Sequence, residues 1–335
     1  MTCQNIQPQK TNVTPQSEHI SPAAYIGIDV AKTQLVIAHN GQVTNVANSK
    51  RDLQSWLGTL PPNCALALEA TSSYHQLLAD MAYAAGHTVY VLNPKQIKHY
   101  RTATRGRAKT DLCDALLLAR YLEREYMQHH PYQPLSPDSM RLCSLLRRRA
   151  AVVKSKILLR LSLEGEAKAL GLGTKLTSLL DSYKRLLKAI DLKIDQLLKK
   201  PQFEEAAGRL LSIVGIGPLS GAALLVALER GEFKTPEAFV AFFGLDPVSR
   251  DSGQSNGRRR LSKQGDSETR RLLYNAAMSA SLTELWRPLY LRYLNRGFTR
   301  IQTLCIMARK LDRIAWALYK KKQTFCAQKF AKSLT

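Results

Sequence analysis

Four acidic residues of the chain stand where their side chains could meet around a metal ion. Asp29 ends the short apolar run Tyr-Ile-Gly-Ile-Asp, and Glu69 ends a second apolar run that begins at Cys64. Asp111 and Asp114 lie three residues apart, which places both on one face of a helix. Two divalent ions about 4 Å apart, held by carboxylates, activate a nucleophile and stabilise the leaving oxygen in phosphoryl transfer. The four acids therefore predict a site for Mg²⁺ or Mn²⁺ that acts on a phosphodiester.

Each of these acids, taken alone, also has a structural explanation. Asp111 begins a predicted helix, where a negative charge interacts favourably with the helix dipole, and Asp114 fits an ordinary surface position. Glu69 is harder to explain in this way, because it follows a run of apolar residues and so lies near a core. The order of the four acids in a predicted sheet, with a basic segment from residue 101 to 109 beside them, favours the metal site.

A second candidate site is a polar loop from about residue 246 to 265, rich in Gly, Ser and Arg. Ser252 lies next to Gly253, and a serine in a flexible basic loop can attack a phosphate while arginines stabilise its charge. Such a loop can also serve only to bind phosphate. No histidine follows His130, so activation of Ser252 must come from a metal, a carboxylate or another domain. The cations of this loop that we predict to bind nucleic acid are Arg258, Arg259, Arg260 and Lys263.

Two further segments are candidates for contacts with nucleic acid. Residues 214–218 read Val-Gly-Ile-Gly-Pro between apolar helical flanks, which matches a helix-hairpin-helix whose backbone N–H groups hold a phosphate at Gly215 and Gly217. The alternative is a tight turn between core helices. The basic loop before Asp111 adds a further set of predicted contacts, which are Arg105, Arg107 and Lys109.

The net charge points to a polyanionic partner. The 335 residues hold 49 Lys and Arg against 26 Asp and Glu, a formal charge of +23. So large an excess favours nucleic acid, because neutralising phosphates releases counterions; a basic protein without such a partner is the alternative. The cysteines form no Cys-x-x-Cys pair, which makes a zinc site a poor interpretation, and the N-terminus lacks the apolar core of a signal peptide. These features predict a cytoplasmic protein, with no membrane partner.

The pattern of elements predicts an α/β domain with a mixed sheet, followed by a mostly helical part. Three strand-like runs joined by an Asn-Gly hairpin turn precede alternating helices and strands, and long runs with 3–4 spacing of apolar residues follow. The helical runs suit an antiparallel coiled coil, an assembly arm or a surface that lies along nucleic acid. The predicted divisions are a disordered tail at 1–22, the α/β domain at 23–130, a linker at 131–140, a helical hairpin at 141–203 and a last domain at 204–335.

Several of these motifs, taken in order, resemble one family of transposases. Tyr-Ile-Gly-Ile-Asp-Val-Ala-Lys, Leu-Glu-Ala-Thr and Lys-Thr-Asp-Leu-Cys-Asp-Ala resemble the DEDD, RuvC-like (ribonuclease-H-like) domain of the insertion-sequence family numbered one hundred and ten, which includes the Piv invertase. Leu-Ser-Ile-Val-Gly-Ile-Gly-Pro, Phe-Phe-Gly-Leu-Asp-Pro, Asp-Ser-Gly and Leu-Ser-Lys-Gln-Gly resemble its partner domain. The resemblance covers about residues 24 to 320.

The resemblance implies a DNA recombinase for excision and integration of an insertion sequence. It implies that Asp29, Glu69, Asp111 and Asp114 bind Mg²⁺ and that Ser252 forms a covalent phosphoserine with DNA. It further implies a dimer or synaptic tetramer in which the two sites come from different protomers, and a bridge RNA that pairs with donor and target DNA. The alternatives are a site-specific invertase, a RuvC-like nuclease that uses metal-activated water alone, and a non-catalytic nucleic-acid-binding protein.

Overall fold

A computed structural model describes residues 21–70, 74–104, 110–248 and 259–332 of the chain. Several predicted positions therefore lie outside the described residues; they are the tail up to residue 20, Arg105, Arg107, Lys109, Ser252 and Arg258. The chain divides into two compact units, with the boundary between Tyr132 and Gln133. Each unit is described by itself, and the finer domain boundaries drawn above stay predictions.

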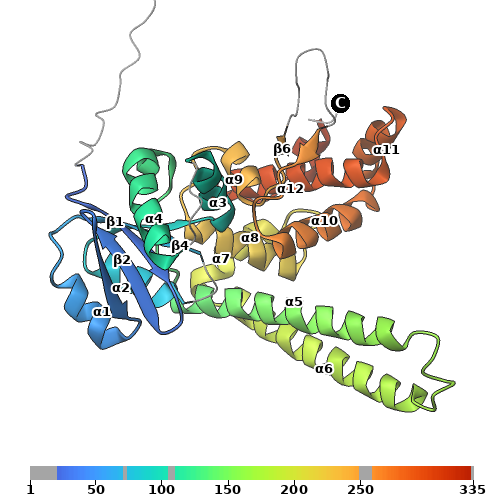
Figure 1. The fold of residues 1–335 in the computed structure, drawn as a ribbon. Helices are drawn as coiled ribbons and strands as arrows, with labels where there is room; N and C mark the ends of the chain where they lie inside the picture. Colours follow the sequence, from blue (N-terminus) through green and yellow to red (C-terminus); the bar gives the residue numbers. More distant parts are fainter. Residues whose placement is uncertain (1–20, 71–73, 105–109, 249–258, 333–335) are drawn as a thin grey trace, which may run out of the picture. The chain divides into compact units, whose positions relative to one another are not determined.

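The first unit is built on a five-stranded mixed sheet (Figure 1). Its strands are β1 Tyr25–Val30, β2 Gln34–His39, β3 Gln42–Ala47, β4 Ala65–Glu69 and β5 Thr88–Leu92. Their order is β3-β2-β1-β4-β5, antiparallel from β1 to β3 and parallel from β1 through β4 to β5. The predicted turn between β2 and β3 is confirmed: Asn40 and Gly41 have φ of 50° and 77°, the left-handed conformation that a two-residue hairpin needs.

Helices cover both faces of this sheet. On one face, α1 (Lys50–Leu57) and α2 (Gln76–Ala84) pack on Ile26, Ile28 and the side chains of Leu66 and Leu68. On the other face, α3 (Pro94–Ala103) and α4 (Asp111–Glu125) contribute to a second cluster that includes Ala65 and Ala67, and a short 3₁₀ turn at Tyr126–Gln128 follows α4. The mixed α/β prediction is confirmed for this unit.

Gly27 sets the distance between β1 and α4. A Cβ at this position would come within 2.0 Å of the Ala115 carbonyl oxygen and 2.3 Å of the Ala119 amide nitrogen. Only glycine permits so close an approach of two backbones. The contact brings the first turn of α4 beside the end of β1.

The segment after β5 differs from the prediction. We expected a basic loop to begin at Arg101, but α3 runs from Pro94 to Ala103 and contains that residue. The helix has a regular start, since the Asn93 side chain accepts a hydrogen bond from the Lys95 amide and proline occupies the first turn. Its consequence is that Arg101 is held on a helix rather than in a loop.

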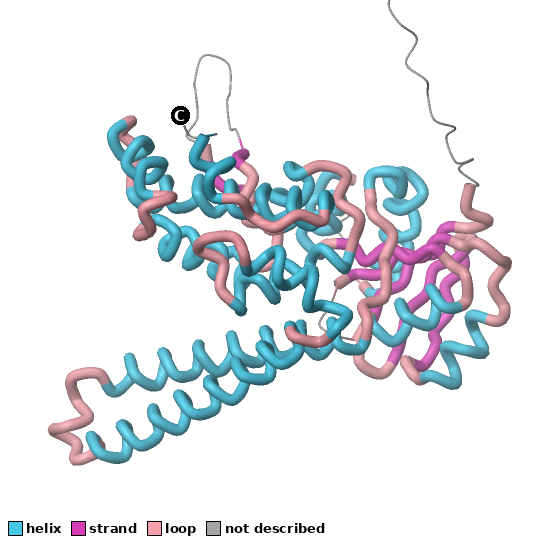
Figure 2. The backbone as a smooth tube through the Cα atoms, turned by 180° about the vertical axis from the view of Figure 1, so that it is seen from behind, coloured by secondary structure: helices cyan, strands magenta, loops and turns pink. Residues whose placement is uncertain are grey.

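The second unit is almost entirely helical, as predicted. Its elements are α5 Pro137–Leu163, α6 Gly173–Leu198, α7 Pro201–Leu211, α8 Pro218–Arg230, α9 Pro236–Phe242, β6 Pro247–Val248, β7 Arg260–Leu261, α10 Ser267–Ser281, α11 Arg287–Asn295, α12 Arg300–Lys321 and α13 Ala327–Lys332. Figure 2 shows α5 and α6 lying side by side as a long two-helix hairpin. The ion pair between Arg149 and Asp191, at 2.5 Å, joins these two helices.

The base of this hairpin belongs to the same core as the later helices. Leu142 of α5 and Ile194 of α6 are fully buried in one cluster with Phe203, Leu224 and Trp286. Leu158 and Leu161, farther along α5, are 58% and 54% exposed. The hairpin is therefore anchored at one end.

The Val-Gly-Ile-Gly-Pro segment forms the turn between α7 and α8. Gly215 has φ of 102°, and a Cβ there would meet the Ala280 side chain of α10 at 2.6 Å. The Gly217 amide donates to the Ser220 hydroxyl at 3.1 Å. Packing and capping thus account for both glycines, so a phosphate contact at this turn stays a prediction.

Candidate active site and serine loop

The structure places Asp29 and Glu69 at neighbouring strand ends. Ile28 of β1 pairs with Leu68 of the parallel strand β4, so the two acids follow at the same level of the sheet. Side chains alternate between the faces of a strand. Asp29 therefore shares its face with Gly27, which lies against α4, and Glu69 shares its face with Ala67, which packs in the cluster of α4. Both acids thus project on the side of the sheet that α4 covers.

The other two acids begin α4. The Thr110 side chain caps this helix by accepting a hydrogen bond from the Cys113 amide at 3.2 Å, so the helix begins at Asp111, as predicted. The cap fixes the first turn, which carries Asp111 and Asp114. The close contact of the helix at Gly27, described above, holds that turn next to the strand that ends in Asp29.

The electrostatics of Asp29 show that the four acids act on one another. Burial raises the pKa of the Asp29 carboxyl from 3.8 to about 6, and the charges of Asp111, Asp114 and Glu69, in that order, add to the rise. Like charges in one place disfavour ionisation of each member. The structure therefore brings all four predicted acids within electrostatic reach of a common point.

Arg101 is a member of this site that the sequence motifs did not reveal. Its guanidinium lies 2.5 Å from the Asp114 carboxylate, and the two side chains are only 19% and 13% exposed. The pair joins α3 to α4. The Asn-Pro start of α3 is a signal for a helix that contains Arg101, but it does not show which element the helix packs on or which acid Arg101 meets.

A divalent cation fits the ligand types and the charge of this site. Carboxylate oxygens are hard donors of the kind that Mg²⁺ and Mn²⁺ prefer. The charges of Asp111, Asp114 and Glu69, which add to the effect of burial on the pKa of Asp29, give the site an excess of negative charge. No group of three or more His, Cys, Asp and Glu side chains stands close enough to hold a metal ion within the described parts of the chain. In the arrangement described, Asp114 is engaged by Arg101. Binding of a cation by all four acids therefore requires the carboxylates to draw together.

The serine loop is carried on an ordered stem. Strands β6 and β7 pair at Val248 and Arg260, and below them the Ser262 amide donates to the Asp246 carbonyl at 2.9 Å. The Lys263 amide donates to the Gly244 carbonyl at 3.1 Å. The Ser262 hydroxyl also donates to the Asp246 carboxylate. The stem thus fixes both ends of the loop, whereas Ser252 itself lies outside the described residues.

Arg270 holds the base of this stem. Its guanidinium donates to the carbonyl oxygens of Phe243, at 2.9 Å, and Gly265, at 2.6 Å. A Cβ on Gly265 would lie 2.0 Å from the Phe242 carbonyl oxygen, so the two arms of the stem touch at this glycine. Arg270 therefore has a structural role at the base of the stem.

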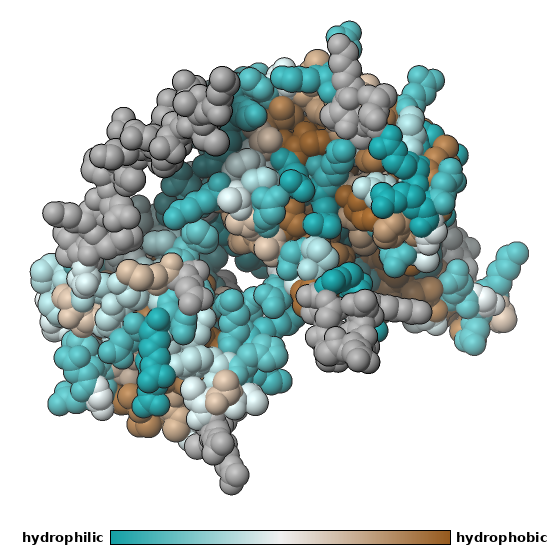
Figure 3. All heavy atoms as spheres, turned by 90° about the horizontal axis from the view of Figure 1, so that it is seen from above, coloured by the Kyte–Doolittle hydropathy of each residue, from teal (hydrophilic) through white to brown (hydrophobic). Residues whose placement is uncertain are grey.

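Of the predicted cations of the loop, Arg259, Arg260 and Lys263 are described, and all three are exposed. Lys263 has a left-handed φ of 54° and lies near Cys305 of α12, where its charge lowers the thiol pKa against the rise that burial causes. On the face drawn in Figure 3, hydrophilic residues cover much of the described surface, with hydrophobic residues scattered between them. All three cations therefore reach the surface, where a phosphate can approach them.

None of the described helices is both long and apolar enough to cross a lipid bilayer.

Comparison with known families defines the class of the chain. A transposase model named for a DEDD domain matches residues 26–163, which contain all four acids, and a second transposase model matches residues 207–291, which contain the serine loop. The chain is thus a transposase or DNA recombinase. It belongs to the IS116/IS110/IS902 family of transposases.

Curated relatives extend over nearly the whole chain. The pilin gene-inverting protein of Moraxella bovis is 29% identical over 319 residues, which cover 90% of this chain and 97% of the relative. The pilin gene-inverting protein of Moraxella lacunata is 28% identical over the same shares of the two chains. The transposase for insertion sequence element IS1328 of Yersinia enterocolitica is 27% identical, covering 88% of this chain and 96% of the relative. The similarity therefore includes both units.

Proposed function

We propose that this transposase cuts and rejoins DNA by combining a divalent-metal site at the four acids with nucleophilic attack by Ser252. The observation that carries the proposal is the placement of Asp29, Glu69, Asp111 and Asp114 on one side of the sheet, where burial and then the charges of the other three acids raise the pKa of Asp29. A strand order of β3-β2-β1-β4-β5, with an acid at the end of β1 and another at the end of β4, supports a RuvC-like fold for this unit.

The acids would hold Mg²⁺ or Mn²⁺, which stabilises negative charge on the phosphate and lowers the pKa of an oxygen that it contacts. The residues of the chain supply the rest. Ser252 Oγ attacks the phosphorus as the bond to a deoxyribose oxygen breaks. The Ser252 proton passes to a carboxylate or to solvent, and the released deoxyribose oxygen takes up a proton from solvent to become a hydroxyl. One ester bond replaces another, so the phosphoserine keeps the energy needed to reseal the strand in a new pairing.

The exposed cations of the stem support a role in holding DNA. Arg259, Arg260 and Lys263 stand at or below the point where the loop leaves its stem, and guanidinium groups stabilise the charge of a phosphate under attack. We further propose, on the resemblance alone, that the acids and the serine come from different protomers of a dimer or tetramer, with the α5–α6 hairpin as assembly arm, and that a bridge RNA selects the DNA.

Trapping a covalent protein–DNA adduct tests the serine chemistry. The Ser252→Ala variant should bind DNA with the wild-type affinity but form no adduct and no recombinant product. Ser249→Ala and Ser255→Ala are matched controls in the same loop and should keep both. Cutting that survives in Ser252→Ala would show a nuclease that uses water alone, and adduct formation in that variant would assign the nucleophile to another residue.

The metal site is tested by Asp29→Ala and Glu69→Ala. Each variant should retain salt-dependent DNA binding, because phosphate contacts by Lys and Arg dominate it, and each should lose cleavage with both Mg²⁺ and Mn²⁺. Full activity of either variant would leave a non-catalytic binding protein as the better interpretation.

Inversion is the second candidate outcome of the reaction, because two relatives that cover most of this chain are named pilin gene-inverting proteins. Two plasmids distinguish these outcomes. One carries a segment between inverted sites and tests inversion, and the other carries the flanked gene as a movable element and tests transposition. Products from only one of the two plasmids would decide between them.

A further inference from the structure

A small cavity opens in the second unit between α5, α8, the end of α9 and the start of α10. Its volume is about 140 Å³, the scale of one planar heterocycle. Apolar side chains form its floor, chiefly Ala223, Val226, Ala227 and Leu272. Neither sequence motif nor family match assigns a role to it. A ligand that fits must present flat apolar faces.

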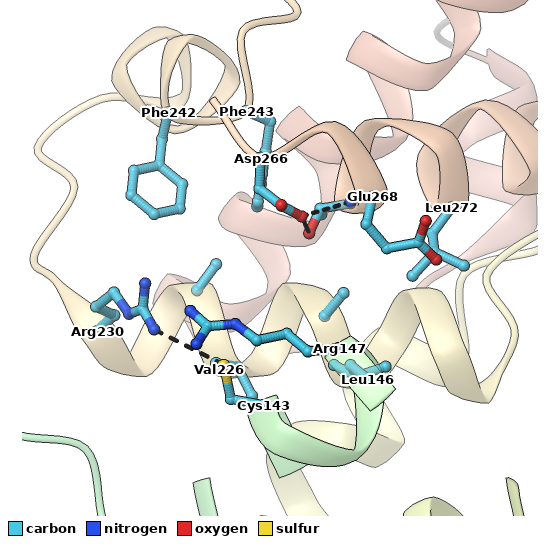
Figure 4. A pocket seen from close by; sticks show the side chains of 13 residues that line it. Cys143, Leu146, Arg147, Val226, Arg230, Phe242, Phe243, Asp266, Glu268 and Leu272 are labelled. Atoms are coloured by element: carbon cyan, nitrogen blue, oxygen red, sulfur yellow. Dashed lines mark hydrogen bonds between the residues drawn. The ribbon is translucent and has the colours of Figure 1, made fainter. Parts of the chain in front are cut away.

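Charged groups of opposite sign face one another across this cavity (Figure 4). Arg147 and Arg230 lie on one wall, and Asp266 and Glu268 lie on the other, where both carboxylate oxygens of Glu268 are bound by Arg271. Because the cavity separates the two walls, no ion pair links them in the described part of the chain. The site therefore offers hydrogen-bond donors to one edge of a ligand and acceptors to the opposite edge.

Several hydrogen-bonding groups of these side chains have no partner among the described residues. Arg147 makes no hydrogen bond or ion pair with any described residue, and Arg230 makes only a long contact from Nη2 to the Cys143 sulfur, at 3.9 Å. Asp266 accepts from Thr269 with Oδ2 alone, at 2.7 Å, which leaves Oδ1 without a partner among the described residues. Two guanidinium groups and a carboxylate oxygen are thus available to a bound molecule.

An aromatic ring stands at the mouth. Phe242 is 38% exposed, and Figure 4 shows its side chain pointing from α9 toward the wall that holds Arg230. Ring contacts with Phe233 and Phe243, each at 5.2 Å between centroids, hold it in place. A ring fixed in this way provides a stacking surface for a base.

The cavity adjoins the stem of the serine loop. Phe242 and Phe243 lie just before one arm of the stem, and Asp266 follows the other arm at the start of α10. Arg270 ties these arms together through the carbonyls of Phe243 and Gly265. A nucleotide held in the cavity would therefore lie next to the base of the stem that carries the serine loop.

We propose that this cavity binds one unpaired nucleobase of the DNA substrate, extruded from the helix near the point of strand exchange. The base would stack on Phe242 over the apolar floor, accept hydrogen bonds from Arg147 and donate one to Asp266, while Arg230 meets the adjoining phosphate. Extraction of one base separates the strands locally and fixes the register of the duplex against the loop. The inference rests on the DNA substrate of the proposed function but not on the serine chemistry.

Binding of a bulged duplex tests the inference with the full chain. Fluorescence anisotropy compares a fully paired duplex with the same duplex carrying one extra unpaired nucleotide, whose base is already free to leave the stack. We expect the bulged duplex to bind about tenfold more tightly. Equal affinity of the wild-type protein for the two duplexes would overturn the proposal.

Variants then locate the preference. Ala227→Leu fills the floor, Phe242→Leu removes the stacking ring, and Arg147→Gln removes an exposed donor without altering the core. Each should lower the bulge preference, which is the ratio of the two affinities, to near one. Matched controls are Arg148→Gln, the neighbouring exposed arginine outside the cavity, and Phe298→Leu, a phenylalanine of 36% exposure on another surface. Both should keep the preference.

The thermal midpoint of each variant shows whether it folds. A folded Arg147→Gln and a folded Phe242→Leu that both keep the wild-type bulge preference would refute the site, whatever happens to Ala227→Leu. An equal loss in the two controls, or a preference seen only with bulged RNA, would refute it as well. Ser252→Ala should keep the preference, so a failure of the serine chemistry and a failure of this site give different results.

Discussion

Replacing Asp29 by asparagine should stabilise the folded protein at neutral pH while it removes activity. The pKa of Asp29 rises from 3.8 to about 6, a shift of about two units. Each unit corresponds to about 1.4 kcal/mol, which sets an upper limit of about 3 kcal/mol for the cost of the ionised carboxylate. The side chain is only partly buried, so solvent screening lowers the expected gain to about 1–2 kcal/mol.

The pH dependence has a definite sign. The folded-state pKa of Asp29 is above the unfolded value, so the folded protein holds the proton between pH about 4 and about 6, where the unfolded chain has lost it. Because of Asp29, the free energy of unfolding of the wild type therefore falls as the pH rises through this range. Above pH about 6, the contribution of Asp29 no longer changes. Asp29→Asn lacks this contribution. The difference between the two proteins should grow from near zero at pH 4 to its full value at pH 7.5.

Urea unfolding of the two proteins at both pH values, with and without Mg²⁺, measures these quantities. On the proposed metal site, Mg²⁺ should bind the folded state in preference to the unfolded chain and so stabilise the wild type at pH 7.5, with a much smaller effect on Asp29→Asn. Glu123→Gln, an exposed acid on α4, is the control and should change stability by less than about 0.5 kcal/mol at either pH. A difference between wild type and Asp29→Asn that does not vary with pH would refute the electrostatic coupling of the four acids.

Three further perturbations test the supporting structure. Gly27→Ala should lower the free energy of unfolding by about 3 kcal/mol or more and reduce activity, because its Cβ would lie 2.0 Å from a backbone oxygen of α4. Urea unfolding should show no such loss for the control Gly58→Ala, whose Cβ would meet nothing nearer than 3.5 Å. Asp312 is fully buried in α12, both its carboxylate oxygens lack partners among the described residues, and burial raises its pKa well above 3.8. Asp312→Leu should therefore be more stable than the wild type above pH 7. Calorimetry should show this stability difference shrinking toward pH 4. Arg101→Gln leaves Asp114 without its ion pair beside three other acids, which should lower the free energy of unfolding by about 2 kcal/mol in the absence of metal. Mg²⁺ should stabilise this variant more than it stabilises the wild type.

Local patterns predicted most of the elements, because each has a signal within a few residues of itself. The turn at Asn40 and Gly41 follows from the φ values that a two-residue hairpin needs, and the start of α4 follows from the Thr110 cap. Both appear where the sequence placed them. The helix from Pro94 to Ala103 differs from the basic loop that we expected to begin at Arg101, although a proline directly after Asn93 fits the first turn of a helix.

The acid site was predictable for a reason that the register makes clear. A residue that ends a buried strand lies at a sheet edge, and alternation decides its face, so Asp29 and Glu69 needed only the parallel pairing of β1 with β4 to come together. No comparable rule connects Arg101 with Asp114, or Phe242 with Arg147, because these pairs depend on how separate helices pack. The side of the sheet on which a strand-end residue lies can thus be predicted from backbone alternation. The residues that two helices bring together depend on tertiary packing instead. The sequence could accordingly name the four acids but neither the cation that engages one of them nor the cavity at the foot of the serine loop.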